Sequence, residues 1–370
     1  MPLFYLVFLG GSILFSIMIN ELLLKFSKNL GTRHKDDLLR WNAESKPSVG
    51  GLSFFIIFLV SLSLMALLRL PSESMDHDMM LGIFGASLMG FMIGLADDAF
   101  NTRPLLKFLG QLLAANLLVT SGIIIELTPD LSINYLFTII WVIGIMNSIN
   151  MLDNMDGVTA SVSLSIIASI ITVIFLHEGL SDSVILLLLG VATSLIGFLV
   201  FNWHPSKMFM GDTGSQFLGV FLAGISIVYL WGFRNESNEY LQLKQLVLPL
   251  LAFIVPIIDT ATVFIRRLLR GKSPFVGGRD HTTHHLSYLG LSDGLVALIV
   301  FLLSSLSTFL IYFIFQLSEE WSYLYTFAAF AYFLLVFTGM QILYNKGARR
   351  HREQEALAAE REEERKLIID

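Results

Sequence analysis

The sequence contains no cysteine, and only 15% of its 370 residues are charged. The absence of cysteine excludes disulfide bonds, a thiolate nucleophile and a metal site with cysteine ligands. A soluble domain carries about 25% charged residues. The scarcity of charge, with 55% hydrophobic residues and a mean hydropathy of +0.71, therefore indicates an integral membrane protein. The formal net charge of −6 is small and indicates no particular class of partner.

Long apolar runs dominate the chain, and a membrane-spanning helix needs roughly 20 such residues. The runs are continuous rather than alternating, which predicts an all-α polytopic membrane protein with about 11 transmembrane helices. The first run lacks a basic segment before it and is too long for a cleavable signal peptide. The expected spans are 2–24, 49–70, 79–96, 105–125, 133–149, 158–177, 184–201, 214–232, 245–265, 292–316 and 320–344.

Lysine and arginine are concentrated on one side of this predicted topology. Of the 24 such residues, 21 fall in alternate loops and the C-terminal tail, and only Arg69, Arg234 and Lys244 fall on the other side. Cytoplasmic loops are enriched in lysine and arginine, so we expect the N-terminus outside and the C-terminus in the cytoplasm. We divide the chain into a transmembrane domain, 1–344, and a charged cytoplasmic tail, 345–370, whose opposite charges at helical spacing predict a solvated helix.

Five polar motifs all fall on the predicted cytoplasmic side. They are "KPSVGG" before the second span, "GLADDAF" after the third, "NSINMLDNMDG" after the fifth, "FNWHPSKMFMGDTGS" between the seventh and eighth, and "SPFVGGRDHTTHHL" after the ninth. Each motif alone is typical of a helix cap, a turn or a polar loop, but ionisable groups at membrane depth are costly and usually functional. Because all five motifs lie on the same predicted side, we expect them to form one functional site. In the third motif the polar residues recur every three positions, and repeated steps of three rotate away from one face of a helix. This spacing predicts that the chain leaves helical geometry near Asn154 or Gly157.

Carboxylates gathered at one membrane surface would repel one another unless a cation neutralised them. Mg²⁺ is the natural candidate because it takes oxygen ligands and combines one or two carboxylates with substrate phosphates. The sequence places five such acids in these motifs: Asp97, Asp98, Asp153, Asp156 and Asp212.

Histidines and glycine-rich turns supply the other candidate groups. The "HTTHH" segment could offer a Zn²⁺ site, although the basic residues around it favour an anion. "GDTGS" and "SVGG" each open a predicted helix, and helix N-termini bind anions. Asp259 lies within the ninth span, where it is either a buried hydrogen-bonded residue or a functional group.

In this order, from Lys46 to Leu286, the motifs resemble the polyprenyl-phosphate N-acetylhexosamine-1-phosphate transferases of glycosyltransferase family 4. The phospho-MurNAc-pentapeptide translocase is related to that family. The resemblance implies a catalytic transmembrane domain in the bacterial inner membrane, in which a polyprenyl phosphate such as undecaprenyl phosphate attacks the β-phosphate of a cytosolic UDP-sugar such as UDP-GlcNAc. UMP leaves, and the reaction initiates cell-wall or lipopolysaccharide glycan synthesis. It also implies Mg²⁺ or Mn²⁺ as cofactor and no nucleic-acid partner, and it leaves a homodimer open.

The resemblance assigns roles to residues of this chain. Asp212 would bind the metal, with Asn150 as co-ligand. The acids expected to act in catalysis are Asp97, Asp98, Asp153 and Asp156. The residues expected to bind substrate are Lys46, Asn147, Asn202, Arg279, His281, His284 and His285. A phosphate monoester has a second pKa near 6, so the lipid phosphate is already mostly dianionic at neutral pH. We therefore expect Asp97 to orient the acceptor or the metal shell rather than to act as a base.

Two motifs depart from the family pattern and bear on donor choice. The family's Asp-Gly-x-Asp-Gly is Asp153-Asn154-Met155-Asp156-Gly157 here, and its His-x-His-His becomes His281-Thr282-Thr283-His284-His285. The last two histidines match directly, and His281 is the alternative to Thr282 for the first. The rival functions are the pentapeptide translocase, a transporter and a binding or scaffold protein. A transporter would carry its ionisable groups near the bilayer midplane, which the clustering at one surface disfavours.

Overall fold

The computed structural model describes residues 2–27, 46–68, 75–177, 183–232, 243–271, 278, 280–317 and 323–369. These residues are helical apart from turns, short connections and an isolated β-bridge between Ser48 and Phe209. Arg279, which the sequence suggested as a substrate-binding residue, lies outside the described residues.

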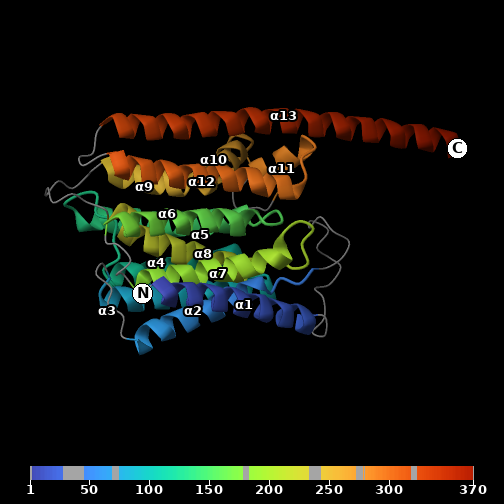
Figure 1. The fold of residues 1–370 in the computed structure, drawn as a ribbon. Coiled ribbons are helices and arrows are strands. Elements are labelled where there is room, and N and C mark those ends of the chain that lie inside the picture. Colours follow the sequence, from blue (N-terminus) through green and yellow to red (C-terminus); the bar gives the residue numbers. More distant parts are fainter. Residues whose placement is uncertain are drawn as a thin grey trace.

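Nine helices in the described part of the chain are long and apolar enough to cross a membrane, which confirms a polytopic membrane protein. In a helix every backbone polar group is bonded within its own segment, as a bilayer requires. These helices lie side by side as a bundle (Figure 1). They are α1 (Pro2–Ser27), α2 (Gly50–Leu67), α3 (His77–Phe100), α5 (Leu131–Leu152), α6 (Val158–His177), α7 (Val184–Asn202), α8 (Gly211–Ser226) with its π-helical continuation η1 (Ile227–Trp231), α12 (Asp293–Leu317) and α13 (Tyr323–Ile369).

The two remaining predicted spans form shorter or broken helices. The stretch 245–265 is a pair, α9 (Leu243–Ala252) and α10 (Ile254–Leu269), bent by 80° at the break between them. Pro249 lies inside α9, and a proline inside a helix removes a hydrogen bond and bends the chain. The stretch 105–125 corresponds to α4 (Pro104–Thr120), with 17 residues. Each predicted stretch thus falls on a helix or a helix pair. The number of 11 spans and the orientation of the termini stay predictions.

Helix α8 lies at the centre of the bundle, and every residue of α8 except Asp212 is buried. It packs against α3, α5 and α2. Glycines allow the close approach at its N-terminal end. A side chain on Gly94 of α3 would overlap the backbone of Asp212, and one on Gly51 of α2 would overlap the backbone of Gly214. This packing brings the first turn of α8 directly against the ends of α2 and α3.

Helix α13 is 47 residues long and is drawn in red in Figure 1. Its first part lies along the bundle, where it packs against α11 (Thr282–Tyr288), α9 and α10, and its C-terminal part extends past the other helices. The predicted boundary between residues 344 and 345 falls within this one helix. The separation of a transmembrane domain from a cytoplasmic tail therefore stays a prediction, and its position is not marked by a helix end.

Candidate active site at the ends of helices α3, α4, α5 and α8

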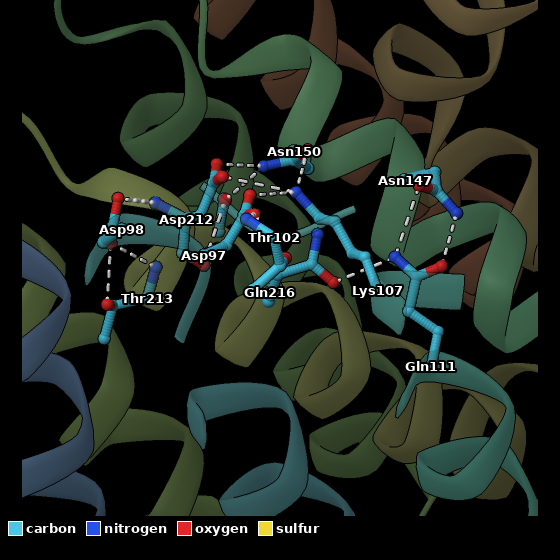
Figure 2. A network of polar contacts seen from close by, with 11 residues as sticks. Asp97, Asp98, Thr102, Lys107, Gln111, Asn147, Asn150, Asp212, Thr213 and Gln216 are labelled. Carbon is cyan, nitrogen blue, oxygen red and sulfur yellow. Dashed lines mark hydrogen bonds and ion pairs between the residues drawn. The ribbon is translucent and has the colours of Figure 1, made fainter. Parts of the chain in front are cut away.

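The ammonium group of Lys107, in the first turns of α4, lies between three side-chain oxygens of other helices (Figure 2). Its Nζ is 3.1 Å from Oδ2 of Asp97, 3.2 Å from Oδ1 of Asn150 and 3.3 Å from Oδ2 of Asp212. These three oxygens come from the last turn of α3, the last turn of α5 and the first turn of α8. We call this group of four residues the Lys107 cluster. It unites three residues that the sequence assigned to catalysis and metal binding.

Further hydrogen bonds fix the oxygens of the Lys107 cluster. Asn150 donates through Nδ2 to Oδ1 of Asp212 at 2.7 Å and to Oγ of Ser215 at 2.9 Å, so its Oδ1 is the atom turned toward Lys107. Asp97 accepts from the backbone N–H of Thr102 at 2.9 Å and from its hydroxyl at 2.6 Å. Each carboxylate or amide is therefore held by two or more partners, which orients the remaining lone pairs.

Asp98 faces the N-terminus of α8 rather than the Lys107 cluster. Its Oδ1 accepts from the backbone N–H of Asp212 at 3.1 Å, and its Oδ2 accepts from the N–H of Thr213 at 2.8 Å and from the Thr213 hydroxyl at 2.7 Å. A carboxylate at a helix N-terminus satisfies free N–H groups and interacts favourably with the helix dipole. Asp98 thus orients the turn that carries Asp212. The catalytic role that the resemblance implies for Asp98 stays a prediction.

At both helix N-termini that the sequence predicted to bind anions, other groups of the protein accept hydrogen bonds from the backbone N–H groups. At α8 the anion is Asp98. At α2 the N–H groups of Gly50 and Gly51 donate to the carbonyls of Phe209 at 3.1 Å and Met210 at 2.9 Å. The glycine-rich turns therefore join the segment before α8 to α2 and α3. The sequence expectation that these turns offer free N–H groups to a substrate is not supported by this geometry.

Asn147, about one turn before Asn150 on α5, belongs to an amide network. It donates to Oε1 of Gln111 at 3.0 Å and to the carbonyl of Ile143 at 2.8 Å, and Gln111 donates to Oε1 of Gln216 at 3.0 Å. Gln111 is buried on α4, one turn after Lys107, and Gln216 is buried on α8. Figure 2 shows this network beside the Lys107 cluster. Sequence analysis did not identify either glutamine, because single glutamines in apolar helices carry no motif.

The segment after α5 leaves helical geometry where the sequence predicted. Helix α5 ends at Leu152, α6 begins at Val158, and Gly157 between them has a φ of +74°, a conformation that glycine adopts without strain. The N–H of Gly157 donates to Oδ1 of Asn202 at 3.0 Å, and Asn202 donates through Nδ2 to the carbonyl of Met208 at 3.0 Å. Asn202 therefore joins the turn after α5 to the segment before α8. Asp153 occupies the C-cap of α5.

Asp156 lies in a second group, formed by the turn after α5 and the segment between α7 and α8. It accepts from the backbone N–H of Ser206 at 3.0 Å and from the Ser206 hydroxyl at 2.7 Å. Nδ1 of His204 lies 3.2 Å from Oδ2 of Asp156. Lys46 donates to Oγ of Ser206 at 3.1 Å, and its ammonium lies 5.4 Å from the centre of the ring of Phe209. The five predicted acids therefore divide between groups instead of meeting at one point.

The histidine motif is held in place by Asp259 of α10. Nδ1 of His281 lies 2.8 Å from Oδ2 of this buried acid, and the N–H of Thr282 donates to its Oδ1 at 2.8 Å. Sequence analysis left Asp259 open between a buried hydrogen-bonded residue and a functional group. The structure shows that it anchors the start of α11. The hydroxyl of Thr283 donates to Oδ1 of Asn154 at 2.8 Å, which joins the motif to the turn after α5.

His284 and His285 are both buried on α11, and His285 packs against α13. Both ring nitrogens of His285 are buried without a hydrogen-bond partner among the described residues, and its ring centre is 3.7 Å from that of Tyr344. Burial, followed by the positive charge of Arg266, lowers the pKa of His285 to about 4. His285 is therefore a neutral packing residue in this structure at physiological pH.

Asp280 forms an ion pair beside the histidine motif. Its Oδ2 accepts from Nε of Arg267 at 2.8 Å. Although burial raises the pKa of Asp280, the hydrogen bond and charge of Arg267 outweigh it and hold the pKa below the ordinary value. Asp280 thus stays charged and ties the segment before α11 to the end of α10.

Two sets of donor atoms could hold a metal ion. The Lys107 cluster offers three oxygens, which fits Mg²⁺ or Mn²⁺. The second set is Asp156, His204 and Asp293, whose ligand atoms lie within 4.8 Å of one another and combine oxygen with imidazole nitrogen. Within the described ranges no other group of three acidic or histidine side chains meets that distance, so the three predicted histidines do not form such a set.

Comparisons with known proteins show the family to which the chain belongs. The glycosyl transferase family 4 matches residues 80–230, a range that contains the whole Lys107 cluster. The "Probable undecaprenyl-phosphate N-acetylglucosaminyl 1-phosphate transferase" of Bacillus subtilis is 30% identical over 301 residues, which cover 79% of this chain and 80% of that protein. The "Decaprenyl-phosphate N-acetylglucosaminephosphotransferase" of Mycobacterium leprae is 30% identical over 282 residues, covering 69% of this chain and 70% of that protein.

A third relative carries a different name. The "Phospho-N-acetylmuramoyl-pentapeptide-transferase" of Streptococcus uberis is 30% identical over 250 residues, covering 60% of this chain and 73% of that protein. The apolar helices define a polytopic membrane protein, and the family match and relatives define an enzyme of the phosphosugar transferase class. The chain belongs to glycosyl transferase family 4.

Several residues of the site were missed by sequence reasoning. The sequence analysis counts Lys107 only as a basic residue of a loop, although its place ten residues after Asp97 is a signal that could identify it. His204 and Ser206 lie in the "FNWHPSKMFMGDTGS" motif, but the sequence alone indicates no role for either residue. Asp293 begins α12 and has no local signal, because only the packing of α12 brings it near His204.

Proposed function

We propose that the protein transfers an N-acetylhexosamine-1-phosphate from a UDP-sugar to a polyprenyl phosphate and releases UMP. Membership of the family and the names of the relatives support this class of reaction. The observation that carries the proposal is the convergence of oxygens from Asp97, Asn150 and Asp212 on one cationic group at 3.1, 3.2 and 3.3 Å. Oxygens arranged around a positive charge are the ligands that a phosphoryl transferase needs for its metal.

The three oxygens of the Lys107 cluster would hold Mg²⁺ or Mn²⁺. A divalent cation bound there would neutralise negative charge on the donor diphosphate. Asp98 positions Asp212 through the first turn of α8. Asp97 is fixed by Thr102, so it is suited to orienting the acceptor or the metal shell. Phosphoryl transfer depends mainly on such positioning and on charge stabilisation.

We assign the remaining predicted residues to substrate binding or to positioning. We assign Lys46 and Asp156 to the nucleotide side of the site, and His281, His284 and Arg279 to the donor diphosphate or sugar. Asn147 and Asn202 have their side-chain groups engaged within the protein, so we assign them to positioning rather than to substrate contact. Asp153, at the end of α5, would lie beside the metal and the nucleotide.

We place the active site at the cytoplasmic face of a bacterial inner membrane. The distribution of basic residues supports this orientation, because 21 of 24 fall on the side that carries the site motifs. UDP-sugars are cytosolic, and the prenyl chain of the acceptor lies in the bilayer beside the apolar helices. The product would be a polyprenyl-diphospho-sugar that initiates synthesis of a cell-envelope glycan.

The test is release of UMP by the purified protein in detergent with undecaprenyl phosphate, Mg²⁺ and a panel of UDP-sugars. We expect UMP to appear only when lipid, metal and one particular donor are all present. Asp212→Asn should abolish the release, and Lys25→Gln, a change in an exposed ion pair with Glu21 on α1, should not alter it. No UMP from any donor, with a correctly folded protein, would overturn the proposal and reopen a transporter or scaffold function.

A pentapeptide translocase is the second candidate, because the Streptococcus uberis relative is also 30% identical. That match covers 60% of this chain, whereas the Bacillus subtilis match covers 79%, which favours the N-acetylhexosamine-1-phosphate transferase. Including UDP-MurNAc-pentapeptide in the donor panel separates the two. UMP release with this donor alone would favour the translocase.

A further inference from the structure

The position of Lys107 has a consequence for metal binding. Its ammonium lies at the point on which oxygens of Asp97, Asn150 and Asp212 converge. The side chains are mostly buried, with exposed fractions of 16% for Lys107, 12% for Asp97 and 25% for Asp212. Salt and water therefore screen these charges less than they would at an open surface.

An ammonium and a divalent cation cannot use the same three oxygens together. Mg²⁺ requires oxygen ligands at about 2.0–2.1 Å in near-octahedral geometry, whereas the Nζ of Lys107 is 3.1 to 3.3 Å from these atoms. A cation bound to the three oxygens would lie next to the ammonium, with like charges only a few ångströms apart in a poorly screened site. One of the two must leave.

The lysine is the group that is able to move. It lies near the start of α4, and its side chain is a flexible four-carbon stem that ends in a compact charge with three donors. The oxygens, in contrast, are held in place: Thr102 donates to Asp97, Asn150 donates to Ser215, and Asp98 fixes the turn of Asp212 by accepting from its N–H. A shift of the ammonium costs less structural change than a rearrangement of α3, α5 and α8.

We propose that Lys107 competes with the divalent cation for the oxygens of the Lys107 cluster, so that cation entry expels the ammonium. This inference rests on the metal site of the proposed function and adds a residue that regulates its occupancy. The expelled ammonium needs a new negative partner, which an anionic phosphate of a substrate supplies. Cation binding and phosphate binding are then coupled through Lys107, since each favours the same displaced position of the side chain.

The test measures metal binding without any substrate. The full-length protein is purified in detergent, and binding of Mn²⁺ alone is followed by electron paramagnetic resonance of the free aquo ion and by calorimetry. Lys107→Met keeps the length of the side chain and removes its charge, so we expect it to bind Mn²⁺ about tenfold more tightly than the native protein. Lys107→Arg keeps the charge, so its affinity should stay near the native value or fall below it.

Control variants separate competition from general effects. Lys25→Met removes a lysine on α1 and should leave the Mn²⁺ affinity unchanged. Asp212→Asn in the Lys107→Met background should abolish the gain, because the gained affinity depends on the cluster oxygens. If Lys107→Met does not fold, Lys107→Gln replaces it, and thermal unfolding without metal establishes which variants are folded.

Each outcome decides between the two proposals. Native or weaker Mn²⁺ affinity in the folded uncharged variants would overturn the competition even if the native protein releases UMP. Tighter binding in these variants, with no UMP release by the native protein, would support the competition and overturn the proposed function. No Mn²⁺ binding to any of the proteins would overturn both the metal site and the competition.

Discussion

Tyr344 of α13 covers His285 of α11, with the two ring centres 3.7 Å apart. The ring centre of Tyr344 also lies 3.9 Å from Cζ of Arg266. The guanidinium of Arg266 donates to Gln341 at 2.9 Å and to Asn345 at 3.0 Å. The middle of α13 therefore fixes both α10 and α11, the two elements that carry the histidine motif and its anchor. Residues 344 and 345, where the transmembrane domain was expected to end, therefore help to hold the histidine motif in place.

Gly347 should be intolerant of substitution because α11 approaches α13 at this residue. A Cβ at this position would overlap the backbone carbonyl of His285. We expect Gly347→Ala to lower the free energy of unfolding by about 1–3 kcal/mol through overpacking and to reduce UMP release. Gly339→Ala is the matched control on the same helix, since a Cβ there meets nothing within 4 Å. Thermal unfolding in detergent measures both, and equal melting temperatures would contradict the expectation.

Stability should fall in mild acid because of His285. Burial lowers its pKa to about 4, whereas in the unfolded chain it has the ordinary value of 6.5. Between these values the unfolded chain binds more protons, so the contribution of His285 to stability is complete above about 6.5 and is lost as the pH falls toward 4. His285→Phe should show a smaller drop in unfolding temperature from pH 7.5 to 5 than the native protein. His77→Phe, at an exposed residue of α3, should keep the native drop.

Asp98→Ala should impair the site without removing any oxygen of the Lys107 cluster. The change leaves the N–H groups of Asp212 and Thr213 without their acceptor, which costs about 1–2 kcal/mol of stability as for a lost helix cap. Because the turn that carries Asp212 is loosened, Mn²⁺ affinity and UMP release should both fall, and calorimetry and the transferase assay measure them. Asp76→Ala removes the comparable cap at the start of α3, where Asp76 accepts from the N–H of Met79 at 2.8 Å. It should lower stability without lowering metal affinity.

Asp97→Asn distinguishes orientation from proton transfer. The acceptor phosphate has a second pKa near 6 and is mostly dianionic at neutral pH, so we expect the variant to lose a similar factor of rate, on the order of 10², at pH 5.5 and at pH 8. UMP release at the two pH values measures this. A loss much larger at pH 5.5 than at pH 8 would show that Asp97 accepts a proton from the lipid phosphate.

The amino-acid sequence by itself determined the membrane class, the positions of the apolar helices and the motifs that surround the site. Continuous apolar runs of this length have one stable arrangement in a bilayer, and the helix end near Asp153 follows from its local polar residues and Gly157. Only tertiary packing places Lys107 among its three oxygens and brings Asp98 to the N-terminus of α8. Packing likewise brings Asp259 to His281 and Tyr344 against His285. Each of these contacts joins different helices, and its geometry depends on how closely glycines such as Gly94 and Gly347 let backbones approach. No local pattern records that distance, so only the tertiary structure shows which polar groups meet.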